Sequence, residues 1–278
     1  MDEKARHSGQ YVLGHSSQEL ERLSAQAQLY DPLTLEFLRS VGVEAGMRVL
    51  DVGCGRGDVS FIAARLVGPT GFVVGIDRAP AAVETARQRA NALSSNNTRF
   101  LVGDASGVAA DGPFDAAVGR LVLEFSPDPP ALLRRIAAQV RPGGVIAFHE
   151  VDWSGCRARP EVPTLSRCIA WGTEVLQKSG ADPYMGLKLY DTFVRAGLPA
   201  PTLSVQATVG AGPAHPVYVA AAEFVRTLLP AIEARGVASA REVDIETLAR
   251  RISDEAVAAR ATVVWWSLIG AATRKPIA

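Results

Sequence analysis

The chain has 278 residues, and its 29 Lys and Arg residues balance its 29 Asp and Glu residues, so its formal net charge is zero. This balance argues against a protein that binds nucleic acid through a basic surface. With 48% hydrophobic residues, the chain is apolar enough to bury a large core. Its length corresponds to one large domain or two small ones.

The three cysteines are Cys54, Cys156 and Cys168, and no pair has CxxC spacing. An odd number without that spacing argues against a disulfide framework and against a zinc site. Residues 1–10 are polar and charged, unlike a signal peptide. No apolar run approaches the roughly 18 residues that a membrane span needs. The sequence therefore predicts a cytoplasmic protein without a membrane partner.

The first half of the chain predicts helices that alternate with short apolar strands. Residues 16–41 predict two helices, divided at Asp31-Pro32, because Pro is favoured at the first position of a helix. Strands are then predicted at 47–52, 71–76, 99–102, 114–119 and 145–149, and helices at 58–67, 79–93 and 128–140. This alternation is typical of βαβ units and a parallel sheet. Continuous apolar strands predict helices on both faces of the sheet.

After residue 150 the alternation of strands and helices is lost. Helices are predicted at 161–179, 186–196, 217–234 and 243–259, and strands at 202–209 and 263–269. The two added strands give an α/β fold with a mostly parallel seven-stranded sheet. The additional helices are interpreted as a lid. We therefore expect three parts: residues 1–44 as N-terminal helices that close the site, 45–153 as the core, and 154–278 as lid insertions with the last two strands.

A glycine-rich turn follows the first strand, with glycines at positions 53, 55 and 57. Such glycines let the backbone approach a ligand closely, and the helix that follows offers free N–H groups. A tight turn without a ligand is the alternative explanation. The dinucleotide fingerprint G-x-G-x-x-G is absent, because Asp58 stands where its third glycine belongs. This spacing argues against a nicotinamide cofactor.

Asp77 ends the second predicted strand, about twenty residues after the glycine turn. A carboxylate in that position can accept hydrogen bonds from both hydroxyls of a ribose. It can also cap the helix predicted at 79–93. The spacing from the glycine turn favours the ribose.

Five segments along the chain resemble, in order, the motifs of class I S-adenosylmethionine-dependent methyltransferases. They are DVGCGRG, GIDRA, VGDAS, FDAAVGRLVLEF and RPGGVIAFHE, within residues 45–150. The resemblance is especially to the branch that contains the ubiquinone/menaquinone C-methyltransferases. It implies a Rossmann-like fold, S-adenosylmethionine as the cofactor, and methyl transfer to O, N or C of a small, partly apolar acceptor such as a quinone-like molecule or a secondary metabolite. No metal is expected, because Arg120 rather than an acid ends the fourth strand.

The resemblance also implies which residues hold the adenosyl part of the cofactor. Asp77 would bind the ribose hydroxyls, and Arg78 would lie beside the adenine. Asp104, after the third strand, would accept a hydrogen bond from the adenine amine, with Ala105 next to it.

A second group of residues is implied at the methionine end. Gly53, Gly55 and Gly57 would pack against the methionine and the ribose, in a turn that also holds Cys54 and that follows Asp51 at the end of the first strand. Arg120 would border the methionine end, where its charge suits the carboxylate. Tyr11 would close the pocket over the same end. The predicted cofactor residues are thus Tyr11, Asp51, Gly53, Cys54, Gly55, Gly57, Asp77, Arg78, Asp104, Ala105 and Arg120.

His149, Glu150 and Asp152, at the end of the fifth strand, are the candidates for a general base. A base is needed only if the acceptor must lose a proton. Because neighbouring residues on a strand point to opposite faces, at most one of His149 and Glu150 can face the pocket. The alternative is that these side chains cap the strand and bond to the backbone of the lid.

Three other functions remain open on the sequence. An enzyme of the same fold can use the same cofactor motifs for a cyclisation or an isomerisation. A nicotinamide-dependent oxidoreductase is disfavoured by the glycine spacing, and a binding protein without activity would be expected to have lost Asp77 or the glycines. The expected partner is a small-molecule substrate, and the chain is expected to be a monomer or a homodimer.

Overall fold

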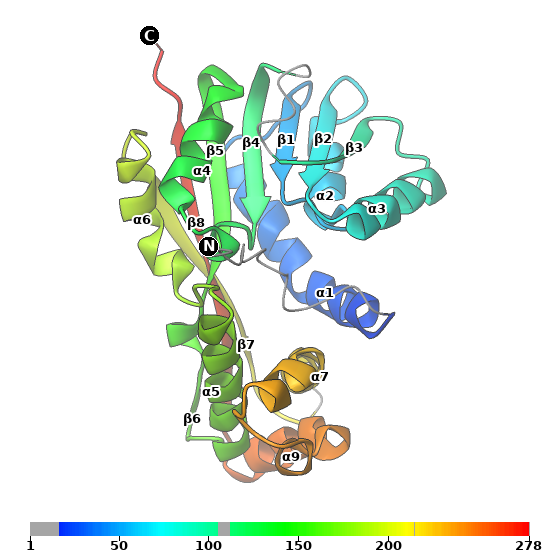
Figure 1. Ribbon diagram of the computed structural model, residues 1–278, viewed down its shortest axis with the longest axis vertical. Helices are drawn as coiled ribbons and strands as arrows, with labels where there is room; N and C mark the ends of the chain where they lie inside the picture. The colour runs from blue at the N-terminus through cyan, green and yellow to red at the C-terminus, as the bar shows by residue number, and fades with distance from the viewer. Residues whose placement is uncertain (1–16, 105–111, 214, 278) are drawn as a thin grey trace, which may run out of the picture.

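The computed structural model describes residues 17–104, 112–213 and 215–277 as one mixed sheet with helices around it (Figure 1). The strands are β1 Arg48–Val52, β2 Phe72–Asp77, β3 Thr98–Val102, β4 Phe114–Arg120, β5 Val140–Asp152, β6 Arg157–Arg159, β7 Thr202–Gly210 and β8 Thr262–Arg274. The helices are α1 Ser17–Ser40, α2 Asp58–Val67, α3 Pro80–Ala92, α4 Pro129–Ala138, α5 Pro163–Lys178, α6 Met185–Arg195, α7 Val217–Ala234, α8 Ala240–Val243 and α9 Ile245–Ala258, with short 3-10 helices η2 Leu123–Phe125 and η3 Trp153–Gly155.

The strand order is β3-β2-β1-β4-β5-β8-β6, and β7 pairs with β8. Strands β1 to β5 pair in parallel, whereas β8 runs antiparallel to β5, β6 and β7. The chain runs outward from β1 to β3 and then returns to β4 on the other side of β1. The two central strands therefore form a topological switch point, and ligands of open α/β sheets bind at the carboxyl ends of the strands there. The α/β sheet expected from the sequence is confirmed, with the three-residue β6 as an eighth strand.

Helices cover both faces of the sheet, as the apolar strands predicted. On β5, Val145 and Ala147 pack with residues of α1 and α2, whereas Ile146 and Phe148 pack with residues of α4 and α6. This alternation continues to the end of the strand, so successive side chains at positions 149 and 150 point to opposite faces.

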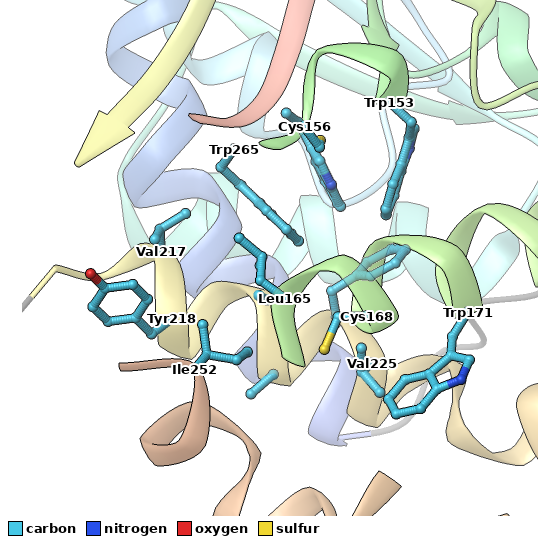
Figure 2. Close-up of a cluster of buried hydrophobic side chains, with 14 of the residues drawn as sticks. Trp153, Cys156, Leu165, Cys168, Trp171, Val217, Tyr218, Val225, Ile252 and Trp265 are labelled. Atoms are coloured by element: carbon cyan, nitrogen blue, oxygen red, sulfur yellow. The ribbon is translucent and has the colours of Figure 1, made fainter. Parts of the chain in front are cut away.

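A second apolar core lies at the far end of the long strands β7 and β8, among α5, α7 and α9 (Figure 1). Trp153, Trp265 and Trp266 lie at its centre, with ring centroids 4.9–6.1 Å apart. Figure 2 shows Trp153 and Trp265 directed toward side chains of α5 and α7. We call these three helices the helical layer. Strand β8 passes through both cores and joins the helical layer to the sheet.

The prediction of two helices within residues 16–41 is wrong. The single helix α1 continues through Pro32, although a proline inside a helix costs about 3 kcal/mol. Tyr30, Thr34 and Phe37 on either side of it are buried. Packing of one continuous helix face against the molecule therefore outweighs the local preference of Pro32 for a helix start.

Two boundaries in the second half also differ from the predicted ones. The helix predicted at 243–259 is α9, which begins at Ile245 because Asp244 has φ 45°, and the short helix α8 precedes it. The last strand was predicted to end at residue 269 but extends to Arg274. Its extra residues include Gly270, where a side chain would collide with the Phe37 ring of α1. Small residues of low strand propensity are thus placed where α1 approaches the sheet.

A matched pair of valine substitutions tests where the core lies. Val118 on β4 is 1% exposed and Val205 on β7 is 65% exposed. We expect Val118→Ala to lower the free energy of unfolding by about 1.5–3 kcal/mol, because it empties space between β4 and the α1 and α2 face. Val205→Ala should change it by less than about 0.5 kcal/mol. Equilibrium urea unfolding measures both, and equal losses would contradict the assignment of the core.

Candidate functional site

The turns after β1 and β4 meet at the switch point. Register pairs Val52 of β1 with Gly119 of β4, so both strands end at the same edge of the sheet. A Cβ on Gly53 would lie 2.7 Å from Cγ2 of Val122, which means that the two turns are in direct contact. The predicted glycine turn therefore lies where the sheet topology places a ligand.

The three glycines of this turn have different reasons to be glycine. Gly53, Gly55 and Gly57 have φ values of 64°, 52° and 89°, in the left-handed region that favours glycine. A Cβ on Gly57 would lie 3.0 Å from the rings of Phe61 and Phe100. A Cβ on Gly55 would have no atom of the described residues within 4 Å. Packing accounts for the outer two glycines, whereas Gly55 leaves its backbone open at this edge of the sheet.

Asp77 joins the end of β2 to this open backbone. Its Oδ2 accepts a hydrogen bond from the Gly55 amide at 2.9 Å, and its Oδ1 accepts one from the Ala79 amide at 2.8 Å. The second bond closes a turn just before α3, which begins at Pro80 and has no side-chain cap. The Asp77 carboxylate, predicted to bind a ribose, is thus held at the end of β2 by two backbone amides.

Arg78 and Asp104 lie together at the ends of the neighbouring strands β2 and β3. The guanidinium Nη2 of Arg78 donates to Oδ2 of Asp104. The structure thus brings together the two side chains that the sequence assigned to the adenine. Two further predicted cofactor residues, Tyr11 and Ala105, lie outside the described residues.

Asp51 is a buried carboxylate at the base of the site. Its Oδ2 accepts a hydrogen bond from the Ser60 hydroxyl at 2.5 Å, whereas its Oδ1 has no hydrogen-bond partner among the described residues. Burial raises the pKa of Asp51 to about 7, although Ser60 and the charge of Arg120 oppose the shift. An unsatisfied buried acceptor is costly, and a donor from a ligand would satisfy it.

Cys54 of the same turn is buried among apolar residues. Burial, with smaller contributions from Asp51 and Asp77, raises the pKa of its thiol. The thiol therefore stays protonated near neutral pH and packs as a small apolar side chain.

Arg120 ends β4 and binds helix α1. Its Nη1 donates to Oδ1 of Asp31 at 3.1 Å and to Oγ1 of Thr34 at 2.9 Å. Burial raises the pKa of Asp31, and the positive charge of Arg120 opposes that rise. In this structure, Arg120 therefore ties the N-terminal helix to the edge of the site.

His149 points to the α1 face of the sheet. Its ring stacks on Phe37 at a centroid distance of 4.7 Å, and neither ring nitrogen has a hydrogen-bond partner of normal geometry among the described residues. Burial and the charge of Arg120 lower the pKa of His149 to about 3, against a smaller opposing effect of Gln206. The imidazole is therefore neutral and covered by α1.

Glu150 points to the opposite face and binds the turn after β4. Its Oε1 accepts hydrogen bonds from the amides of Val122 and Leu123, each at 3.0 Å, and its Oε2 accepts one from the Glu124 amide at 3.3 Å. Burial raises the pKa of Glu150 to about 7, although these three hydrogen bonds lower it.

Asp152, the third candidate base, caps the 3-10 helix η3. It accepts hydrogen bonds from the amide of Ser154 at 3.0 Å and from its hydroxyl at 2.7 Å. All three candidates thus lie near the carboxyl end of β5, where His149 faces α1 and the two acids face backbone amides.

Sequence analysis did not single out Glu124, which is buried beside Glu150. Burial raises the pKa of Glu124 well above its usual range, and the charges of Glu150 and Asp182 add to the rise. The signal was present as a glutamate within the apolar segment LVLEF. The described residues contain no group of three or more His, Cys, Asp or Glu side chains that could hold a metal ion.

Comparison with known proteins assigns the chain to a family. A family model described as a methyltransferase domain matches residues 43–181. The aklanonic acid methyltransferase DauC of Streptomyces sp. is 37% identical over 144 residues, which cover 48% of this chain and 65% of the relative. The 2-phytyl-1,4-naphtoquinone methyltransferase of Synechococcus elongatus is 39% identical over 125 residues, covering 43% of this chain and 50% of the relative. The chain thus spans between half and two thirds of the length of these curated relatives.

A solved structure of the phosphoethanolamine N-methyltransferase 2 of Haemonchus contortus shares the fold. It covers 88% of this chain and 53% of its own, at 16% identity and a TM-score of 0.54. No helix among the described residues meets the length and apolarity needed to cross a membrane. On the match of the family model, the chain belongs to the methyltransferase domain family.

Proposed function

We propose that this protein is an S-adenosylmethionine-dependent methyltransferase that acts on a small, partly apolar molecule. The observation that carries the proposal is the open backbone of Gly55, held by the Asp77 carboxylate at the switch point of the sheet. Membership of the methyltransferase domain family supports it.

The residues at this edge suit the parts of that cofactor. The carboxylate of Asp77 would accept the ribose hydroxyls, and Arg78 and Asp104 would border the adenine. The methionine part carries an ammonium and a carboxylate, and these suit the free Oδ1 of Asp51 and the guanidinium of Arg120. When bound, the cofactor supplies a methyl group activated on a sulfonium.

The protein's own part in such a displacement is to orient the acceptor and exclude water. The buried acids Glu150 and Asp152 already accept hydrogen bonds from backbone amides, and His149 lies under α1 with a pKa of about 3. These contacts favour catalysis by orientation. A general base is required only for an acceptor that must lose a proton.

The helical layer and the N-terminal segment, residues 1–44, are proposed to enclose the acceptor. Trp153 directly follows β5 and belongs to the core of the helical layer, so that layer begins next to the candidate site. The two relatives described above act, by their names, on aklanonic acid and on a phytyl naphthoquinone. We extend to this chain only the class that they share, a small and partly apolar acceptor. The three cysteines are free, in keeping with the reducing cytoplasm as the proposed compartment.

Binding of S-adenosylhomocysteine without added metal tests the cofactor. We expect titration calorimetry to show binding, and Asp77→Ala to weaken it by about 1–3 kcal/mol, because charge-assisted hydrogen bonds to the ribose are lost. Asp115→Ala is the matched control, since Asp115 lies at the start of β4, at the opposite edge of the sheet. Binding of NADH in place of S-adenosylhomocysteine would contradict the proposal.

Transfer of the methyl group is tested with methyl-labelled S-adenosylmethionine and a mixture of quinones and small secondary metabolites. The proposal predicts label on a product and release of S-adenosylhomocysteine. A product formed without label and without consumption of the cofactor would instead indicate a cyclisation or an isomerisation.

The pH dependence of binding tests Asp51, whose pKa of about 7 refers to the ligand-free protein. A ligand ammonium that donates to Oδ1 favours the ionised carboxylate, so affinity for S-adenosylhomocysteine should rise about tenfold between pH 6 and pH 8. Asp51→Asn removes this titration and should flatten the profile. Glu150 titrates in both proteins, so the difference between the profiles isolates Asp51. Parallel profiles would contradict the assignment.

A further inference from the structure

The carboxylate of Glu150 holds three successive backbone amides. The amides of Val122, Leu123 and Glu124 open the 3-10 helix η2, and no side chain of that segment caps it. Successive N–H groups that converge on one point make a binding place for an anion. The carboxylate of Glu150, on the neighbouring strand β5, occupies this anion site and caps η2.

On one side, this turn rests on the cofactor turn. Val122 lies against Gly53, so closely that a Cβ on Gly53 would be 2.7 Å from it. The preceding residue, Leu121, has φ 58°, a left-handed conformation that is unfavourable for leucine. Its amide donates to the His149 carbonyl at 3.0 Å. Contacts from two successive residues of β5 thus hold a strained turn in place.

On the other side, the turn binds the loop between α5 and α6. The Glu124 carbonyl accepts a hydrogen bond from the Asp182 amide at 2.8 Å. Gly186 of α6 packs on the backbone of Glu150, since a Cβ there would lie 3.0 Å from the Glu150 carbonyl oxygen. Glu150 therefore lies between the cofactor turn and the helices proposed to enclose the acceptor.

We propose that Glu150 is a positioning residue that sets the turn at residues 121–124 against the cofactor turn at 53–57 and so raises the affinity for the cofactor. The inference rests on the proposed function. All three hydrogen bonds of the carboxylate among the described residues come from the backbone amides of this turn, and positioning uses these contacts.

The experiment compares Glu150→Ala, Glu150→Gln and Val122→Ala in the full chain. Affinity for S-adenosylhomocysteine is measured by calorimetry, and amide hydrogen exchange of residues 121–124 is measured in the free protein. Glu255→Ala is the matched control. Glu255 also accepts a backbone amide, that of Thr164 at 2.8 Å, but it does so in the helical layer.

Glu150→Ala should weaken binding tenfold or more and speed exchange at residues 122–124. Glu150→Gln should stay within about threefold of the wild type, because its amide oxygen still accepts from Val122 and Leu123. Val122→Ala should also weaken binding, and combining it with Glu150→Ala should cost less than the sum of the two, because both act on one contact. The control should lower the melting temperature and leave affinity unchanged.

Unchanged affinity in Glu150→Ala, or in Val122→Ala if the first variant does not fold, would overturn the inference. Equal losses of affinity in Glu150→Gln and Glu150→Ala would also overturn it, since the acceptor oxygen that Gln retains would then contribute nothing to binding. Failure of the proposed function has a different result, because the wild-type protein itself would not bind S-adenosylhomocysteine.

Discussion

The hydrogen bond from the Gly55 amide to the Asp77 carboxylate ties together the ends of the two strands that carry the site. It fixes a turn of left-handed glycines whose middle member faces open space. The same carboxylate accepts a hydrogen bond from the Ala79 amide, in the turn before α3. One side chain thereby binds both the glycine turn and the turn that leads into the following helix. A ligand that binds here meets a surface already formed, which lowers the ordering cost of binding.

The carboxyl edge of the sheet carries more buried polar groups than a stable core alone would need. Asp51, His149 and Glu150 are each almost completely buried, and Asp51 and Glu150 have their pKa values raised to about 7 by burial. Burial of such groups is costly unless they are paired. Alternate residues of strand β5 face opposite sides of the sheet, one side toward α1 and the other toward the turn after β4. The strained Leu121 lies between these contacts, as is common at functional sites.

The helices and strands at the core of the fold were predicted from local sequence patterns. Helices 58–67 and 217–234 were predicted with the bounds that the structure shows, because their apolar periodicity and flanking residues agree. The strand ends that bring Asp51, Asp77 and Arg120 to one edge also followed from the alternation of strands and helices. Helix α1 did not, because its passage through Pro32 depends on burial against distant elements. The length of β8 was missed for a similar reason: Gly270 looks like the end of a strand until α1 is placed on it.

The residues that bind the side chains of the site could not be predicted from sequence patterns either. Arg120 binds Asp31, 89 residues earlier in the chain, and Glu150 binds amides that no side-chain pattern identifies. A crystal structure of the protein with S-adenosylhomocysteine tests the central claim most directly. The account predicts the ribose hydroxyls on the Asp77 carboxylate and the nucleoside against Gly55. The nucleoside bound elsewhere, or an Asp77 side chain turned away from the sugar, would contradict it.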